Sequence, residues 1–227
     1  MKVIDCDQGG AEWFRARMGI PTASNFGAFL TTKGMLANSA AARRYALELV
    51  GERLTQRPAE HFATRAMDRG TELEPKARAW YQLVSGRSVK EVGFLLSDDG
   101  KCGSSPDGLC ADRGIEIKCP MIATFIDTAE SRVLPADHMA QVQAGMWITG
   151  LRKWDYVVFT DVAGLAPFVI EVAANDEMHA AFAESVAKFC EIVDAMESKL
   201  RTAGHGELPA PDEGPSWNEL VGGRTVG

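Results

Sequence analysis

Residues 105–120 of the chain read SPDGLCADRGIEIKCP and combine turn signals, a short strand and several charged side chains. The run at 115–118 alternates apolar and charged residues, as a half-buried strand does. Glu116 and Lys118 therefore share one face, while Ile115 and Ile117, which alternate with them, face the core. A short hairpin before this strand brings Asp107 beside it. Two carboxylates and an ammonium group are thus predicted to meet at one point of a sheet.

Two carboxylates beside an ammonium group suit a hard divalent cation such as Mg²⁺ or Mn²⁺, which prefers oxygen ligands. A cation held there activates water and neutralises the charge that develops on a phosphodiester. Lys118 positions that water or stabilises the charge. The same residues also suit an ordinary hairpin with a surface Glu–Lys ion pair. By themselves they leave both interpretations open.

The composition is that of a globular chain. Of its 227 residues, 46% are hydrophobic and 24% are charged, which is enough for a sizeable core and excludes general disorder. No apolar run reaches the roughly 18 residues of a membrane span, and the first residues have no signal-peptide core, so we expect a cytoplasmic protein with no membrane partner. The net charge of −7 requires any basic nucleic-acid surface to be local.

The cysteines are few and scattered. No Cys-x-x-Cys pair occurs, which argues against a disulfide framework, a zinc ribbon or an iron–sulfur cluster, and so against an iron–sulfur nuclease. We expect free thiols at all five positions, which are Cys6, Cys102, Cys110, Cys119 and Cys190.

The hydrophobic periodicity predicts one α/β domain over residues 1–201, with a mixed α+β sheet flanked by helices. A Gly/Pro-rich extension follows at 202–227. The expected helices are 11–18, 24–30, 38–54, 71–84, 135–149 and 175–200, and the expected strands are 89–96, 101–105, 115–118, 153–160 and 167–172.

The Pro-Asp…Glu-x-Lys set resembles the signature of the PD-(D/E)xK nuclease superfamily, whose core is restriction-endonuclease-like. The wider string at 105–120 resembles the bacteriophage lambda exonuclease branch, the YqaJ-type viral recombinases. The similarity extends in consistent order over most of 7–197. It includes RMGI at 17–20, TAS at 22–24, GTELE at 70–74 and MAQVQAGMW at 139–147.

This resemblance implies an alkaline-type deoxyribonuclease. Such an enzyme degrades one strand of linear double-stranded DNA from its 5′ end to mononucleotides and leaves a 3′ single strand for recombination by strand annealing. The resemblance also implies two Mg²⁺ or Mn²⁺ ions per active site, a homotrimer ring, an annealing partner protein, and a bacterial or phage-infected host cell. A ring with an acidic outside and a basic channel is compatible with the negative net charge.

The resemblance also assigns roles to residues. It implies that Asp107 and Glu116 bind the metal ions, with the carbonyl of Ile117 as a further ligand, and that Lys118 is the catalytic lysine. Glu74 corresponds to a helix-borne carboxylate that completes the second metal site. Without the resemblance, the segment 71–74 also fits a capping box at a helix start.

Gln141 corresponds to a glutamine that reaches the active site from the following helix, and is implied to be catalytic. On a helix over 135–149 it points away from the stripe formed by Met139, Val142 and Met146. Without the resemblance, a solvated surface glutamine is the favoured interpretation.

Arg17, Ser24 and Ser105 correspond to a pocket for the terminal 5′-phosphate. A guanidinium fork and hydroxyl groups are suitable phosphate donors, although a surface arginine and an N-cap serine are the alternatives. Thr124 stands where the family has a further arginine. Either Arg132 or another cation substitutes for it, or the preference for a 5′-phosphate is weaker.

Two other functions remain open. An endonuclease of the same superfamily would cut circular DNA and would need no pocket for a terminal phosphate. A non-catalytic DNA-binding or recombination scaffold would require a damaged site, whereas Asp107, Glu116 and Lys118 are all present.

Overall fold

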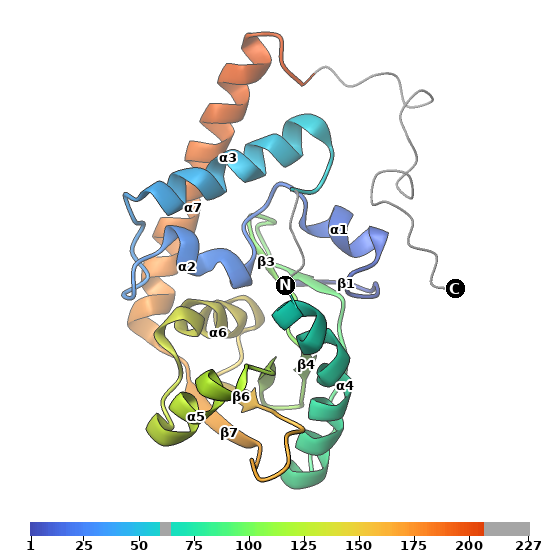
Figure 1. The fold of residues 1–227 in the computed structure, drawn as a ribbon. Coiled ribbons are helices and arrows are strands. Elements are labelled where there is room, and N and C mark those ends of the chain that lie inside the picture. Colours follow the sequence, from blue (N-terminus) through green and yellow to red (C-terminus); the bar gives the residue numbers. More distant parts are fainter. Residues whose placement is uncertain (60–64, 207–227) are drawn as a thin grey trace, which may run out of the picture.

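The computed structural model describes residues 1–59 and 65–206 (Figure 1). In that part of the chain the fold consists of two sheets, seven α-helices and one 3-10 helix. The helices are α1 (Ala11–Arg17), η1 (Ala23–Asn25), α2 (Phe26–Phe29), α3 (Ala40–Thr55), α4 (Arg65–Ser85), α5 (Ile122–Ser131), α6 (Ala136–Thr149) and α7 (Asp176–Thr202). None of these helices is long and apolar enough to cross a membrane.

The larger sheet has the order β4-β5-β6-β7, formed by Gly108–Leu109, Gly114–Lys118, Lys153–Val158 and Phe168–Ala173. Its outer pairs are antiparallel, but β5 and β6 are parallel. A parallel pair needs a long crossover, and α5 and α6 provide it. In this register Glu116 lies opposite Tyr156.

The smaller sheet has the order β1-β2-β3, formed by Lys2–Ile4, Phe94–Leu96 and Gly103–Ser104. Each strand is short, and both pairs are antiparallel. The chain passes directly from β3 into the turn that carries Asp107 and then into β4. The smaller sheet thus delivers this turn to the edge of the larger one.

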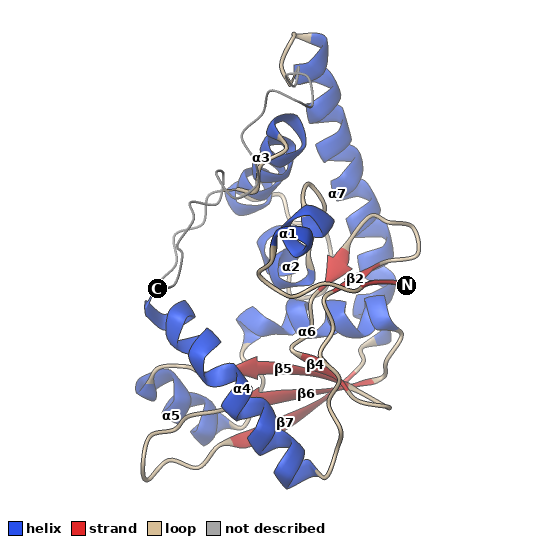
Figure 2. Ribbon diagram, turned by 90° about the vertical axis from the view of Figure 1, so that its right-hand side faces the viewer, coloured by secondary structure: helices blue, strands red, loops and turns tan. Residues whose placement is uncertain are grey.

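Helices cover both faces of the larger sheet. On one face, α4 packs Leu73, Ala77 and Tyr81 against Ile115 and its neighbours. On the other, α6 packs Val142 and Met146 against the aromatic side chains of β6. Figure 2 shows α4 lying across this sheet and α6 between the sheet and α2. Glu116 and Lys118, which alternate with the isoleucines, therefore face α6.

A second core lies beyond α6, where α2, α3 and α7 meet. The rings of Phe29 and Phe189 stack with centroids 4.1 Å apart, and Tyr45 stacks on Phe189. Two helices begin at side-chain caps. The Ser39 hydroxyl accepts from the amide of Ala42 at α3, and Asn175 caps α7 in the same way.

A buried ion-pair network fixes the amino ends of β5 and β6. Arg113 donates to Asp155 at 2.8 Å and to Glu171 at 2.6 Å, and the Tyr81 hydroxyl donates to Asp155 at 2.6 Å. These bonds join α4 to three strands of the sheet. Removing one partner of a buried pair typically costs about 3–5 kcal/mol.

The predicted mixed α/β architecture is confirmed, and most predicted elements lie within a few residues of the observed ones. The prediction of one domain over 1–201 stays a prediction, and the extension falls outside the described residues from 207 onward. The cysteines are free thiols.

Two predictions of local structure were wrong, and two elements were missed. The strand expected at 89–96 is divided between two sheets, because Lys90 pairs with Leu109 of β4 whereas only 94–96 join β1 and β3. The helix expected at 71–84 begins at Arg65, so Glu74 lies inside a helix and the capping-box interpretation fails. Helix α5 and strand β1 were not predicted. No side chain caps the start of α5, so no capping signal marks where it begins.

The spacing between α6 and the sheet depends on a glycine. A Cβ at Gly145 would lie 2.8 Å from the ring of Trp154, which is 1% exposed. At Gly51 in α3, by contrast, a Cβ would meet nothing within 4 Å.

We therefore expect Gly145→Ala to lower the free energy of unfolding by about 1–3 kcal/mol, because the buried ring has no room to move. The matched variant Gly51→Ala should be neutral or up to about 1 kcal/mol stabilising, since alanine favours a helix. Urea denaturation measures both. Equal effects of the two substitutions would contradict this account of the contact.

Candidate active site

The turn before β4 and the second half of β5 bring together the acidic pair predicted from the sequence. Oδ2 of Asp107 accepts a hydrogen bond from the backbone amide of Ile117 at 2.5 Å. The side chain of Glu116 is 5% exposed. Burial and the nearby carboxylates of Glu116 and Glu74 raise the pKa of Asp107 well above its ordinary value. The site thus concentrates negative charge in a buried place.

Lys118 and Gln141 both bind the Glu116 carboxylate. Nζ of Lys118 and Nε2 of Gln141 each donate to Oε1 of Glu116 at 2.6 Å. Burial lowers the pKa of Lys118, but three neighbouring carboxylates outweigh this effect, so the pKa is raised and the lysine keeps its proton. The side chains of the predicted catalytic set therefore lie together, and Gln141 is not a solvated glutamine.

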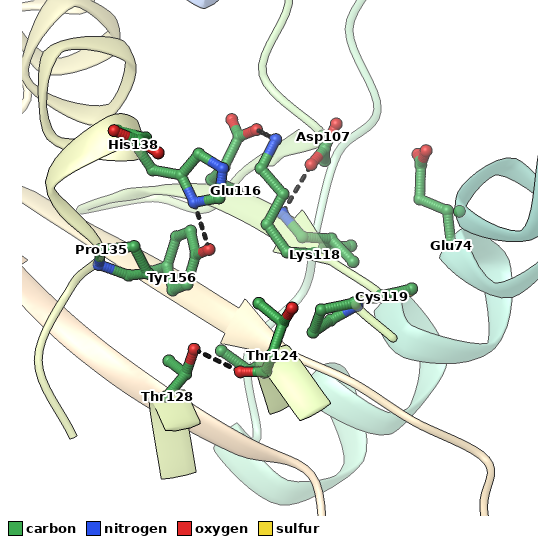
Figure 3. Close-up of a pocket in the computed structure, with 15 residues that line it drawn as sticks. Glu74, Asp107, Glu116, Lys118, Cys119, Thr124, Thr128, Pro135, His138 and Tyr156 are labelled. Carbon is green, nitrogen blue, oxygen red and sulfur yellow. Dashed lines mark hydrogen bonds and ion pairs between the residues drawn. The ribbon is translucent and has the colours of Figure 1, made fainter. Parts of the chain in front are cut away.

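Glu74 approaches from α4, on the other side of Asp107 from Glu116 (Figure 3). Its carboxylate pairs with Arg78, one turn further along the helix. Arg78 also pairs with Glu91 at 2.9 Å and donates to the carbonyl oxygen of Asp107 at 3.1 Å. Burial raises the pKa of Glu74 despite this partner. Arg78 was not predicted as a site residue, although its four-residue spacing from Glu74 is typical of an ion pair on one helix face.

Two hollows adjoin the carboxylates. The first has a volume of about 650 Å³, and Figure 3 shows the side chains around it. The second, of about 570 Å³, extends toward α1. Both are lined by Glu74 and Asp107, so these two residues stand between them. Other residues of the first hollow are Glu116, Ile117, Lys118, Thr124, Thr128, His138 and Tyr156.

The donor set fits a hard divalent cation. Asp107 and Glu116 are oxygen ligands whose mutual repulsion a cation would relieve, and Ile117, which directly follows Glu116 in the chain, lines the same hollow. In the described residues, no three His, Cys, Asp or Glu side chains are already gathered closely enough to hold an ion. Glu74 is instead held by Arg78. A third carboxylate ligand would therefore have to release that arginine.

The residues predicted to bind a terminal phosphate are linked by two others. The Arg17 guanidinium lies 3.9 Å from the centroid of the Trp13 ring and donates to the Thr22 hydroxyl at 3.4 Å. That hydroxyl lies 3.3 Å from the one of Ser24, and Nε1 of Trp13 donates to the Ser105 hydroxyl at 2.7 Å. The sequence did not predict that Trp13 and Thr22 would connect these residues.

The polar chain from Ser24 to Ser105 adjoins the acidic site, because Ser105 lies two residues before Asp107 and Trp13 lines the second hollow. Burial lowers the pKa of Arg17, although Tyr45 and Glu52 partly oppose this. A guanidinium remains charged under such conditions. The Arg17 guanidinium and the hydroxyl groups thus lie within reach of one another, and Trp13 and Ser105 connect them to the acidic turn.

Thr124 and Arg132 lie elsewhere. Thr124 lines the first hollow, on α5. The Arg132 guanidinium lies 4.2 Å from the ring centroid of Phe168, on β7. The structure therefore does not bring Arg132 to the Arg17 group in place of the missing arginine.

Comparison with known proteins gives the family. Residues 12–152 match the YqaJ-like viral recombinase domain. No curated protein sequence matches the chain. Among solved structures, the alkaline exonuclease LHK-Exo from Laribacter hongkongensis is similar with 33% sequence identity and a TM-score of 0.78. The match covers 86% of this chain and 98% of that one, and LHK-Exo has also been solved in complex with dAMP.

A phage-related exonuclease from Haemophilus somnus 129PT shares the fold, with a TM-score of 0.63 and 16% identity over 80% of this chain and 96% of that one. The resemblance to the lambda exonuclease branch inferred from the motifs is confirmed. The chain belongs to the YqaJ-like viral recombinase domain family.

Proposed function

We propose that the chain is a divalent-metal-dependent exonuclease that degrades one strand of linear double-stranded DNA in the 5′→3′ direction. It releases mononucleotides and leaves a 3′ single strand for recombination by strand annealing. The observation that carries this proposal is that two groups of side chains adjoin. One is the carboxylate pair to which Lys118 binds, and the other is Arg17 with its neighbouring hydroxyl groups. Family membership and the similarity to an alkaline exonuclease support a nuclease of this kind.

Asp107 and Glu116 would hold the first metal ion, with the Ile117 carbonyl as a further ligand, and Glu74 would complete a second ion's site. We propose Mg²⁺ or Mn²⁺, two per site. A bound ion supplies an activated water and neutralises charge on the phosphodiester. For Glu74 to take part, its carboxylate must leave Arg78, which stays bound to Glu91 and to the turn.

The protein's own residues then orient the substrate. Lys118 carries a proton and a positive charge, and it offers both to the phosphate under attack. Gln141 fixes the Glu116 carboxylate from the opposite side, so that this carboxylate cannot rotate freely. Neither residue needs to change its charge when DNA binds.

End-dependence would come from the second group. Arg17, stacked on Trp13 and flanked by hydroxyls, presents donors suited to a terminal 5′-phosphate. Ser105 joins this group to the acidic turn through Trp13. Binding the terminal phosphate would thus set the register of the first phosphodiester at the carboxylates.

The assembly is proposed from the family resemblance alone. It comprises a homotrimer ring with DNA in its channel, an annealing partner protein and a cytoplasmic location in a bacterial or phage-infected cell. A ring places cations inside and acidic residues outside, which is compatible with the net charge of −7.

The decisive experiment uses equimolar linear duplex and covalently closed circular DNA with Mg²⁺, each with and without chelator. The linear DNA carries a label at the 5′ end in one sample and at the 3′ end in another. We expect rapid chelator-sensitive release of 5′-labelled mononucleotide with intact circles. Cut circles would replace the proposal by the endonuclease function, and no cleavage of either DNA by the scaffold function.

Lys118→Ala should reduce cleavage about 100-fold or more, because the charge at the phosphate is lost. DNA binding measured with Ca²⁺ and the thermal midpoint should change little. The control Lys188→Ala removes an exposed lysine of α7 and should cleave normally. Normal cleavage by Lys118→Ala would exclude this role for the lysine.

Arg17→Ala should slow cleavage of 5′-phosphorylated ends about tenfold or more and affect 5′-hydroxyl ends less, because it removes a charged phosphate donor. Initial rates on duplexes that differ only in this end group measure the effect. Arg44→Ala, at an exposed arginine of α3, is the control. An equal loss on both ends would argue against a phosphate pocket.

A further inference from the structure

The first hollow contains a histidine–tyrosine pair to which neither the motifs nor the proposed function assigns a role. Nδ1 of His138 and the hydroxyl oxygen of Tyr156 are 2.5 Å apart. His138 lies on α6 three residues before Gln141, so both project from one face of the helix toward the sheet. Tyr156 lies on β6 opposite Glu116 in the parallel register. The pair therefore stands beside the carboxylate that Lys118 and Gln141 bind.

The hydrogen bond between the two side chains determines which nitrogen of the His138 ring carries the proton. The Tyr156 side chain is 2% exposed, and within the described part of the chain its hydroxyl is bonded to His138 alone. A buried hydroxyl proton needs an acceptor, and Nδ1 of a neutral imidazole provides one. The opposite arrangement would leave that proton unsatisfied. The hydroxyl thus donates to Nδ1, and the proton of the ring is on Nε2.

The charge state of both groups supports this arrangement. Burial and the Glu116 carboxylate raise the pKa of Tyr156, so the hydroxyl keeps its proton. Burial and the positive charge of Lys118 lower the pKa of His138 to about 4. The imidazole is therefore a neutral donor at neutral pH. A neutral donor can stand near the Lys118 ammonium without the repulsion that a second cation would bring.

Figure 3 shows where the remaining nitrogen lies. The ring of His138 stands over the Tyr156 hydroxyl on one side, and its other nitrogen faces the side on which Glu116 and Lys118 lie. Both His138 and Lys118 line the same hollow. In the described residues, Nε2 has no hydrogen-bond partner within the protein. It is a preorganised donor with no acceptor of its own.

We propose that His138 is a further catalytic residue, which donates a hydrogen bond from Nε2 to the phosphate group being cleaved, with Tyr156 as the positioning residue that fixes its tautomer. This rests on the proposed nuclease function. No proton is transferred from the imidazole in this role. The bond stabilises the negative charge that builds up on the phosphate oxygens as water attacks, and it complements the charge of Lys118.

The test measures single-turnover cleavage at saturating enzyme and Mg²⁺ for the wild type, His138→Ala and His138→Gln. Removing one such donor should slow cleavage about 100-fold, whereas DNA affinity with Ca²⁺ and the thermal midpoint should stay near the wild-type values. Glutamine carries an Nε2 donor at a similar distance from the backbone. His138→Gln should therefore cleave at least about tenfold faster than His138→Ala. The exposed His205→Ala is the control.

Tyr156→Phe keeps the aromatic ring and removes the hydroxyl. It should slow cleavage less than His138→Ala, because the imidazole can still adopt the productive tautomer for part of the time. In the double variant with His138→Ala, the loss of the hydroxyl should have no further effect on the rate, since Tyr156 acts through the histidine.

Three results would overturn the inference. These are a His138→Ala rate within about twofold of the wild type, equal losses in the Ala and Gln variants with a lowered thermal midpoint, or independent effects of the two residues in the double variant. A wild-type protein that cleaves no DNA would instead overturn the proposed function. The two failures are therefore distinguishable.

Discussion

The hydrogen bond from the Ile117 amide to the Asp107 carboxylate fastens the turn before β4 to the strand that carries Glu116 and Lys118. It holds two carboxylates near each other in a buried place, where like charges repel and little water stabilises them. The positively charged groups and hydrogen-bond donors of the site offset that concentration of negative charge. Lys118 and Gln141 bind Glu116, and Arg78 binds Glu74 and the backbone of the turn.

The same turn lies between two hollows, to which we assign the two tasks that an exonuclease must couple. On one side is the hollow lined by Glu116 and Lys118, and on the other is the hollow that Trp13 lines. Ser105 accepts from the Trp13 indole, and only one residue separates it from Asp107. Under the proposed function, recognition of a chain end and hydrolysis would both depend on this single short segment. A small displacement of this segment would disturb both.

Local patterns predicted what depends on neighbours in the sequence. Period-two alternation places Glu116 and Lys118 on one face, and helical periodicity turns Gln141 away from the methionine stripe. The pattern did not reveal links between distant segments. Trp13 meets Ser105 across 92 residues of the chain. His138 meets Tyr156 because β5 and β6 pair in parallel through a crossover that contains α6. The family resemblance implied the roles of Arg17 and Glu74, for which spacing alone gave alternatives.

The secondary-structure errors have separate causes. Residues 89–96 have the composition of one strand, but pairing with distant segments divides them between two sheets. Helix α4 begins at Arg65, six residues before the capping-box sequence at 71–74 that predicts a helix start. Helix α5 begins without a side-chain cap, so no capping signal marks its start.

The most direct measurement compares the free energy of unfolding of the wild type and Asp107→Asn by urea denaturation at about pH 8, with and without Mg²⁺. Folding raises the pKa of Asp107. The free energy of unfolding of the protein therefore falls as the pH rises through the pKa that Asp107 has in the folded state. Without metal the Asn variant should therefore be more stable than the wild type, since its amide oxygen can still accept from Ile117. With Mg²⁺ the wild type should gain stability and the variant little. A less stable variant without metal, or equal stabilisation of both proteins by Mg²⁺, would contradict the claim that this carboxylate pair is built to hold a cation.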